Sequence, residues 1–256
     1  MRVASWNVNS IRAREAHVRA WLEREKPEVL FLQEIKCEEP AFPREGFAAL
    51  GYQAEVVGQK SYNGVAALAR VPLRVVERSL PGLSEADAAA ARYLEVEAGG
   101  TRLVGLYLPN GNSGGAEGYA AKLRWMEALR DHLAGLLAAE VPLAVLGDFN
   151  VCPTEADLAP GVLGADDALV RPESRAAFRA LIWLGLTDAL RALTPEGPLW
   201  TFWDYQAGAW PRDRGLRIDH ALLSPTLAER LAEARVERDE RGREKASDHA
   251  PILVGW

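Results

Sequence analysis

Apolar and polar positions follow two patterns along the chain. Short, largely apolar runs predict β-strands at residues 3–8, 28–33, 65–70, 143–146, 217–223 and 252–255, and residues 93–97 and 102–108 predict a hairpin across Gly99-Gly100. Apolar residues spaced three or four positions apart predict helices at residues 14–26, 117–139 and 173–184. Strand–helix–strand units combined with a hairpin indicate mixed sheets and not a purely parallel one.

The number of predicted strands leads to a specific architecture. With this many strands in one unit, we expect an α/β fold, a four-layer sandwich of two packed mixed β-sheets flanked by helices. The chain shows no internal repeat, low-complexity tract or convincing linker, and the Gly-rich stretch at residues 110–118 is short enough to be a loop. The prediction is a single domain over residues 1–256.

Charge leaves the class of partner open. The net charge of −6 argues by itself against a polyanionic partner, because phosphate neutralisation needs Lys and Arg. The 30 basic residues include only five lysines, so arginine dominates, and its guanidinium contacts phosphate through two parallel hydrogen bonds. A local basic face on an acidic protein therefore stays compatible with the composition.

Other features of the composition predict a cytoplasmic protein without a membrane partner. No apolar run approaches the roughly 18 residues that a membrane span needs. The first residues turn polar too early for the apolar stretch of a signal peptide. Cys37 and Cys152 are too few for a disulfide framework or a four-ligand zinc site, and they fit buried thiols in a reducing compartment.

Polar residues that could carry chemistry occur where predicted strands end. They are Asn7, Glu34, Asp148 with Asn150, Asp219, and Asp248 with His249. Carboxylate and amide oxygens of this kind suit Mg²⁺ or Mn²⁺. Together with a histidine, they could supply the hydroxide, the charge neutralisation and the leaving-group proton that phosphodiester hydrolysis needs.

Each of these residues also has an ordinary structural interpretation. Glu34 could cap the following segment, Gly147-Asp148-Phe149-Asn150 could be an Asx turn, and Asp219 could pair with nearby arginines. Ser-Asp-His before Ala-Pro could be a plain loop, and His17 and His132 fit helix surfaces. The functional interpretation depends on the joint occurrence of the set, in this order, in one chain.

The ordered set resembles the endonuclease/exonuclease/phosphatase superfamily and, within it, the exonuclease III branch of abasic-site endonucleases. The resemblance covers essentially the whole chain. It rests on the segments Ser5-Trp6-Asn7-Val8-Asn9-Ser10-Ile11-Arg12-Ala13, Gln33-Glu34-Ile35-Lys36 (where Ile35 replaces the usual Thr), Tyr62-Asn63-Gly64-Val65-Ala66, Tyr107-Leu108-Pro109-Asn110-Gly111, Gly147-Asp148-Phe149-Asn150, Gly215-Leu216-Arg217-Ile218-Asp219-His220 and Ser247-Asp248-His249-Ala250-Pro251.

The resemblance implies roles for these residues. The ligands of a divalent cation, Mg²⁺ with Mn²⁺ as a substitute, are expected among Asn7, Glu34, Asp148, Asn150, Asp248 and His249. Asp148 handles a proton, Asn150 and Tyr107 contact the phosphate, and Asp219 orients His249. The group that activates water and the number of metal ions stay open; Asn9 stands where some relatives carry Asp.

Substrate recognition is expected in the segment at residues 200–214, where aromatic residues alternate with arginine. By resemblance, Phe202 and Leu216 line a pocket for a flipped, baseless deoxyribose, with Trp210 at its rim. Trp203 could equally be a core residue. Phosphate contacts are expected from Arg212, Arg214 and Arg217.

The resulting prediction is a monomeric DNA-repair nuclease that cuts double-stranded DNA 5′ to abasic sites in base excision repair. It is expected also to act as a 3′→5′ exonuclease, to clean blocked 3′ ends, and to associate with the nucleoid if the source is bacterial. Two alternatives keep the fold. One is a phosphatase or phosphodiesterase for inositol phosphates or sphingomyelin, which would not need the Leu-Arg-Ile-Asp block, and the other is a non-catalytic binding module.

Overall fold

Two six-stranded sheets organise the computed structural model, which describes residues 1–256. The first sheet has the order β11 (Glu233–Val236), β12 (Ile252–Gly255), β1 (Arg2–Asn7), β2 (Val29–Gln33), β4 (Val65–Ala69) and β3 (Gln53–Val57). The second has the order β5 (Arg74–Glu77), β6 (Tyr93–Ala98), β7 (Thr101–Tyr107), β8 (Leu143–Asp148), β10 (Asp219–Leu223) and β9 (Thr187–Asp188).

Both sheets repeat the same series of pairings. In each, the two central strands run parallel and every other neighbouring pair is antiparallel. A parallel pair needs a crossover connection, which is helix α1 (Ile11–Glu25) between β1 and β2, and helix α4 (Gly115–Ala138) between β7 and β8. The carboxyl ends of each parallel pair therefore lie at one edge of their sheet.

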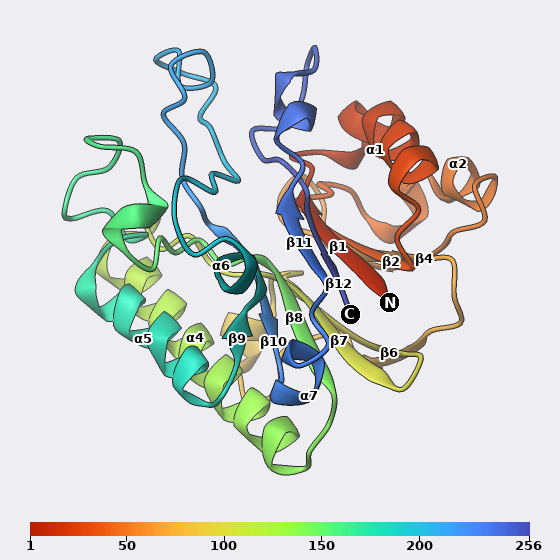
Figure 1. Cartoon of the computed structure of the whole chain (residues 1–256), viewed down its shortest axis with the longest axis horizontal. Helices are drawn as coiled ribbons and strands as arrows, with labels where there is room; N and C mark the ends of the chain where they lie inside the picture. Colours follow the sequence, from red (N-terminus) through yellow and green to blue (C-terminus); the bar gives the residue numbers. More distant parts are fainter.

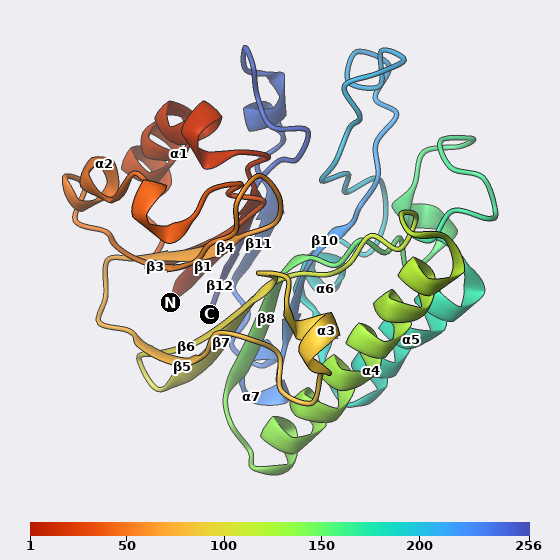
Figure 2. The same cartoon turned by 180° about the vertical axis from the view of Figure 1, so that it is seen from behind.

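Helices cover the outer faces of the two packed sheets, which confirms the four-layer sandwich predicted from the sequence (Figure 1). Helices α1 and α2 (Arg44–Ala48) lie on the first sheet, and α4 and α5 (Pro172–Trp183) lie on the second, as the reverse view in Figure 2 also shows. Three short helices belong to the connections: α3 (Glu85–Ala88), α6 (Ala189–Leu193) and α7 (Pro225–Ala228).

Successive side chains of a strand point to opposite faces of its sheet, and this alternation produces three apolar layers. On β1, Val3 packs between the sheets and Ala4 packs in the cluster under α1; on β8, Ala144 packs between the sheets and Val145 packs under α4. Gly105 of β7 lies where the sheets approach each other closely. A Cβ atom there would lie 2.1 Å from Cδ1 of Phe31 on β2, so a larger residue would force the sheets apart.

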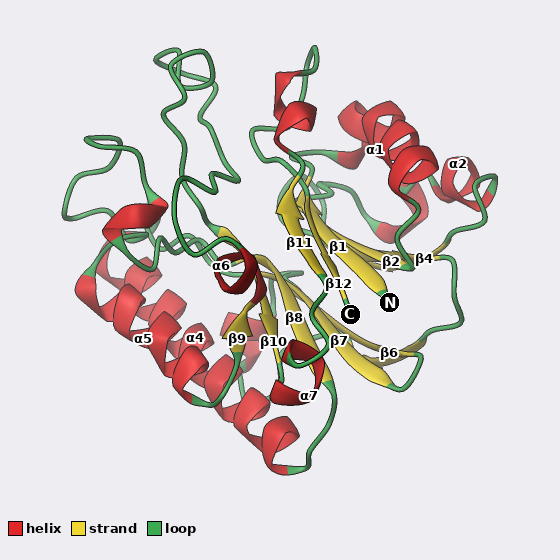
Figure 3. Ribbon diagram, viewed as in Figure 1, coloured by secondary structure: helices red, strands yellow, loops and turns green.

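The eight strands and three long helices predicted from the sequence are all present, with ends shifted by up to three residues. The four strands that the pattern did not predict are β3, β5, β9 and β11, and these are the four outermost strands of the two sheets. Long loops gather at one end of the sandwich, at the top of Figure 3. None of the helices combines the length and the apolar character that crossing a membrane would need.

Candidate active site

The polar residues at the predicted strand ends meet at the loop-bearing end of the sandwich. Asn7 is the last residue of β1, and Asp148 is the last residue of β8. Across its strand, Asp148 lies opposite Tyr107 of β7 on one side and Asp219 of β10 on the other. Because β7 runs parallel and β10 antiparallel to β8, all three residues lie at the same edge of the second sheet.

The amide of Asn7 joins the two sheets by contacting a carboxylate from each. Its Nδ2 donates to Oε1 of Glu34, 2.9 Å away, and to Oδ2 of Asp148, 3.0 Å away. Burial alone would raise the pKa of Glu34, but the hydrogen bond from Asn7 and the ammonium of Lys36, 2.9 Å from Oε2 of Glu34, outweigh burial and lower that pKa. Glu34 is therefore held ionised next to the buried Asp148.

Several of these residues sit on strained backbone. Glu34 has a φ of +50°, Lys36 of +53° and Asn150 of +49°, in the left-handed region that costs a non-glycine residue roughly 1 kcal/mol. The segment at Glu34 is held by hydrogen bonds from the Ser10 N–H to the Glu34 carbonyl (2.7 Å) and from the Ile35 N–H to the Gly64 carbonyl (3.2 Å). The fold thus stores strain where the polar side chains converge.

His249 and Asp219 form a buried, hydrogen-bonded pair. Nδ1 of His249 lies 2.8 Å from Oδ2 of Asp219, and its Nε2 lies 3.7 Å from Oδ2 of Asp148. Burial alone would lower the pKa of His249, but the negative charges of Asp219 and Asp148 outweigh burial and raise it above its usual range. Burial raises the pKa of Asp148 in turn. The cluster can therefore hold and move protons near neutral pH.

Two further groups flank Asp148. The backbone N–H of Asn150 donates to Oδ1 of Asp148 (2.9 Å), and its side-chain Nδ2 donates to the Leu108 carbonyl (2.9 Å), which leaves a second amide hydrogen for a ligand. Burial, with the negative charges of Glu34 and Asp148, raises the pKa of Tyr107 and keeps its hydroxyl a neutral donor. The guanidinium of Arg92 lies 4.5 Å from the centre of the Tyr107 ring.

The oxygen atoms around Asn7 fit a hard divalent cation. Carboxylate oxygens of Glu34 and Asp148 converge on one point, which the amide nitrogen of Asn7 occupies as a neutral stand-in for positive charge. Asp148, Asp219 and His249 also offer ligand atoms within 4.8 Å of one another, but the hydrogen bond between the last two already accounts for their closeness. Asp248 contacts Asn9, and the Asn150 side chain contacts Leu108, so neither side chain joins the Glu34–Asp148 pair.

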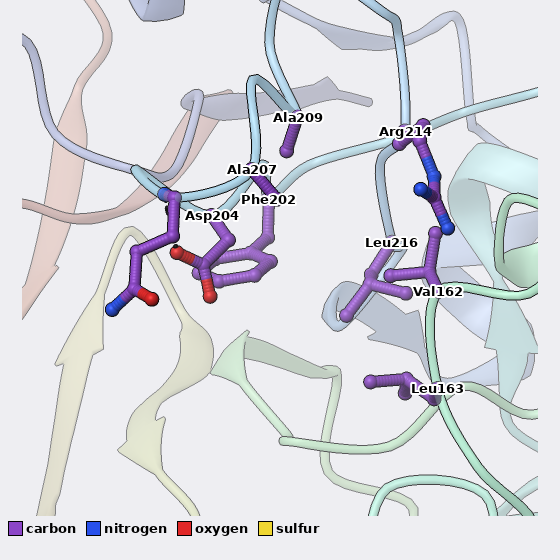
Figure 4. A pocket seen from close by; sticks show the side chains of 9 residues that line it. Val162, Leu163, Phe202, Asp204, Ala207, Ala209, Arg214 and Leu216 are labelled. Atoms are coloured by element: carbon purple, nitrogen blue, oxygen red, sulfur yellow. Dashed lines mark hydrogen bonds between the residues drawn. The ribbon is translucent and has the colours of Figure 1, made fainter.

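A pocket of about 270 Å³ opens beside Phe202 (Figure 4). Phe202 and Asp204 lie on one side and Val162, Leu163 and Leu216 on the other, with Arg214 above. Phe202 also pairs with Leu216 through two backbone hydrogen bonds, and its ring centre lies 5.0 Å from that of His249. The predicted pocket residues Phe202 and Leu216 are thus brought together next to the histidine.

Three other residues predicted to bind the substrate do not line the pocket, and for Trp203 the structure selects the core position that the sequence had left open. Trp203 is a core residue, fully buried with Ala209 and Ala250, and is unavailable for stacking on a ligand. Arg217 is 2% exposed, because its guanidinium is paired with Asp157 (2.7 Å) and Asp188 (2.6 Å); placing it on a DNA-binding face was wrong.

Trp210 does not line the pocket. Its ring packs edge-on against Trp203 and lies between the guanidinium groups of Arg238 and Arg241, at 5.0 and 5.5 Å. These contacts account for its position away from the predicted rim. Arg212 is exposed, as expected for a residue that contacts phosphate, and Arg214 is half-buried and donates to the Gly161 carbonyl (2.8 Å).

Other residues of the site were missed by sequence reasoning. The Asn9 amide donates to Asp248 (3.1 Å) and accepts from Lys36, and so joins the loops after β1, after β2 and before β12. Asn9 and Lys36 both lie in the segments that carry the family resemblance, so the sequence contained a signal for them. Val162 and Leu163 carried no such signal, because they come from an irregular loop whose position depends on tertiary contacts.

Comparisons with known proteins agree with this geometry. Residues 4–249 match the model of the Endonuclease/Exonuclease/phosphatase family. The chain is 35% identical to exodeoxyribonuclease III of Haemophilus influenzae, over 98% of each protein. It is 34% identical to the DNA repair nuclease APEX1 of Danio rerio, over 99% of this chain and 81% of that protein.

Solved structures show the same likeness over full length. The 3′-5′ exonuclease NExo of Neisseria meningitidis superposes with a TM-score of 0.95 at 34% identity, covering 100% of this chain and 99% of that one. An AP endonuclease from Archaeoglobus fulgidus superposes with a TM-score of 0.94 at 32% identity, with the same coverage.

Proposed function

The chain belongs to the endonuclease/exonuclease/phosphatase family, and from this premise we propose that it is a DNA-repair nuclease that hydrolyses the phosphodiester on the 5′ side of an abasic site. The observation that carries the proposal is the contact between Phe202 and His249, which places a small, largely apolar pocket directly beside the proton-handling cluster. A pocket that accepts a baseless sugar but not a nucleotide with its base would select damage by shape.

The residues of the cluster divide the work of hydrolysis. His249, oriented by Asp219, polarises the scissile phosphate in its charged form or, in its neutral form, takes a proton from the attacking water. Asp148, whose pKa is raised by burial, activates water or protonates the departing 3′ oxygen. The free amide hydrogen of Asn150 and the hydroxyl of Tyr107 donate to phosphoryl oxygens, where negative charge builds up.

Glu34, Asn7 and Asp148 would hold a divalent cation, and we propose Mg²⁺, with Mn²⁺ as a substitute. When bound, the cation neutralises charge on the phosphoryl oxygens and lowers the pKa of water. Asn7 would contribute its amide oxygen, Oδ1, which accepts from the Asn9 N–H (3.1 Å). Asp248, to which the Asn9 amide donates, lies beside this arrangement and is a further candidate ligand.

Activity at 3′ ends belongs to the same proposal. A Neisseria relative at 34% identity is described as a 3′-5′ exonuclease, and a variant of it, as a 3′ phosphatase bound to a product DNA hairpin. We therefore include 3′→5′ exonuclease and 3′-end-cleaning activity on duplex DNA. We further propose that residues 1–256 act as one domain and as a monomer, in the compartment that holds the chromosome.

The test is cleavage of a duplex oligonucleotide with one abasic analogue, beside its undamaged twin, in Mg²⁺. We expect incision 5′ to the analogue only. Glu34→Gln should lose roughly 100-fold or more of kcat, because a neutral amide is a weaker ligand of Mg²⁺ than a carboxylate. Glu38→Gln, at an exposed position four residues along, is the matched control. Equal cleavage of both duplexes would contradict the proposed substrate, and an active Glu34→Gln variant would contradict the cation site.

A further inference from the structure

Lys122 is a fully buried lysine beneath the edge of the active site. It lies on α4, and its ammonium donates to the carbonyl oxygens of Asn110 (3.0 Å), Asn150 (2.6 Å) and Ala168 (3.2 Å). An ammonium has three N–H donors, so each one is satisfied by a different segment of the chain. The segments follow β7, follow β8 and precede α5.

The stability of the fold does not by itself explain a cation at this position. All three hydrogen-bond partners are neutral carbonyls, and burial lowers the pKa of Lys122 to about 7. A buried charge without a hydrogen-bonded counter-ion is costly. An apolar side chain of similar volume would avoid that cost but would leave the three carbonyls without these donors. What an apolar side chain could not do is draw three carbonyl groups toward one point.

The three segments carry groups of the active site and of the pocket. While Lys122 binds the carbonyl of Asn150 on the second segment, the Asn150 side chain accepts from Nδ2 of Asn110 (3.0 Å), which lies on the first segment. The third segment is tied to the first as well, because the Ala168 N–H donates to Oδ1 of Asn112 (2.8 Å). It continues the loop that brings Val162 and Leu163 to the pocket.

We propose that Lys122 is a positioning residue for the nuclease reaction. By gathering the carbonyls of Asn110, Asn150 and Ala168 around one ammonium, it fixes the direction in which Asn150 presents its free amide hydrogen and the distance of the pocket wall from the scissile phosphate. This inference rests on the proposed function, and it assigns Lys122 no contact with the DNA.

The test compares Lys122→Met with Leu129→Ala, a change of another fully buried residue on the same helix, whose apolar side chain makes no hydrogen bond to the three segments. Both variants should unfold more easily than the wild type. At a temperature where both are folded, only Lys122→Met should lose kcat on the abasic duplex, by roughly 10- to 100-fold as for a catalytic group displaced by about 1 Å, with KM within about threefold. On an Asn150→Ala background, Lys122→Met should add little further loss. A kcat equal to that of Leu129→Ala, or losses that multiply, would overturn the proposal.

A readout without substrate keeps this test separate from the test of the nuclease activity. Amide hydrogen exchange at residues 110–112, 150–152 and 167–170 should be faster in Lys122→Met and unchanged in Leu129→Ala. If Lys122→Met does not fold, Lys122→Gln, which keeps two N–H donors, takes its place with the same expectation. If the wild type does not cleave abasic DNA but the two variants show this exchange pattern, the proposed substrate is refuted and the anchoring role is not. Unchanged exchange in all three segments refutes the anchoring role whatever the substrate.

Discussion

Asp219 and His249 should act as one unit. The carboxylate binds Nδ1 of the imidazole and raises its pKa although burial opposes this, so Asp219→Asn removes both the charge and the fixed tautomer. We expect turnover to fall by about 100-fold or more, while DNA affinity measured in Ca²⁺ stays nearly unchanged. His249→Asn should behave alike, and the double variant should be little worse than either. Losses that multiply would show that the two residues work independently.

At the scale of residues, candidate catalytic side chains could be predicted from the sequence where a polar residue directly follows an apolar strand. Asp148 after Ala144–Leu146 is such a case, because the strand pattern alone places its carboxylate at a sheet edge. Burial of a charged residue could not be predicted in the same way. The partners of Arg217 lie 60 and 29 positions away in the chain, so only the folded structure shows that its charge is neutralised inside the protein.

At the scale of elements, Glu95 links β6 to α4 and should make this contact sensitive to acid. It is fully buried and interacts with Tyr93 (2.6 Å), His132 (2.7 Å) and Arg102. Burial alone would raise its pKa, but these hydrogen bonds lower it from 4.5 to about 2. A depressed folded-state pKa contributes stability that is present above the unfolded-state value and is lost as the pH falls from about 4.5 toward 2.

Glu95→Gln should therefore cost about 2–3 kcal/mol of unfolding free energy at pH 7, and this difference from the wild type should shrink between pH 5 and pH 2.5. Urea unfolding followed across this range measures it. Glu97→Gln changes a partly exposed carboxylate on the same strand and serves as the control. A deficit that stays constant with pH would mean that Glu95 is not the titrating group.

The four unpredicted strands share a physical reason. Each is the outermost strand of its sheet, and only one residue in all four, Val56, is buried. Edge strands cover less of the core than central ones, so the apolar runs and strict alternation that identify a strand are weak in them. Central strands such as β8, buried along its whole length, carry the strong pattern, and they were also the strands that bring the active-site residues together.

At the scale of the whole molecule, an acidic protein must bind DNA through a local patch. Arg212 is exposed on the loop beside the pocket, so Arg212→Ala should weaken binding to damaged and undamaged duplexes alike and flatten the slope of log affinity against log salt by about one unit. Arg217→Met should leave the slope unchanged and lower stability, because Asp157 and Asp188 lose their buried partner.

Phe202→Ala is measured in the same salt titration of binding, which is carried out in Ca²⁺ with both duplexes. It should keep the slope and reduce the preference for abasic DNA, since the pocket wall distinguishes shape and not charge. A slope that is unchanged in Arg212→Ala would place the DNA-binding face elsewhere. Undiminished damage preference in Phe202→Ala would show that this pocket does not read the lesion.

The strand order of the first sheet has a consequence for synthesis on the ribosome. Its central strand β1 is synthesised before all the other strands of the two sheets, yet its neighbour β12 is synthesised after all of them. Until β12 has been synthesised, one edge of β1 is unpaired, and Asn7 lacks the neighbouring Asp248 and His249. The cluster is therefore incomplete while the first eleven strands are being made. A nuclease with this topology cannot cut nucleic acid near the ribosome during that period.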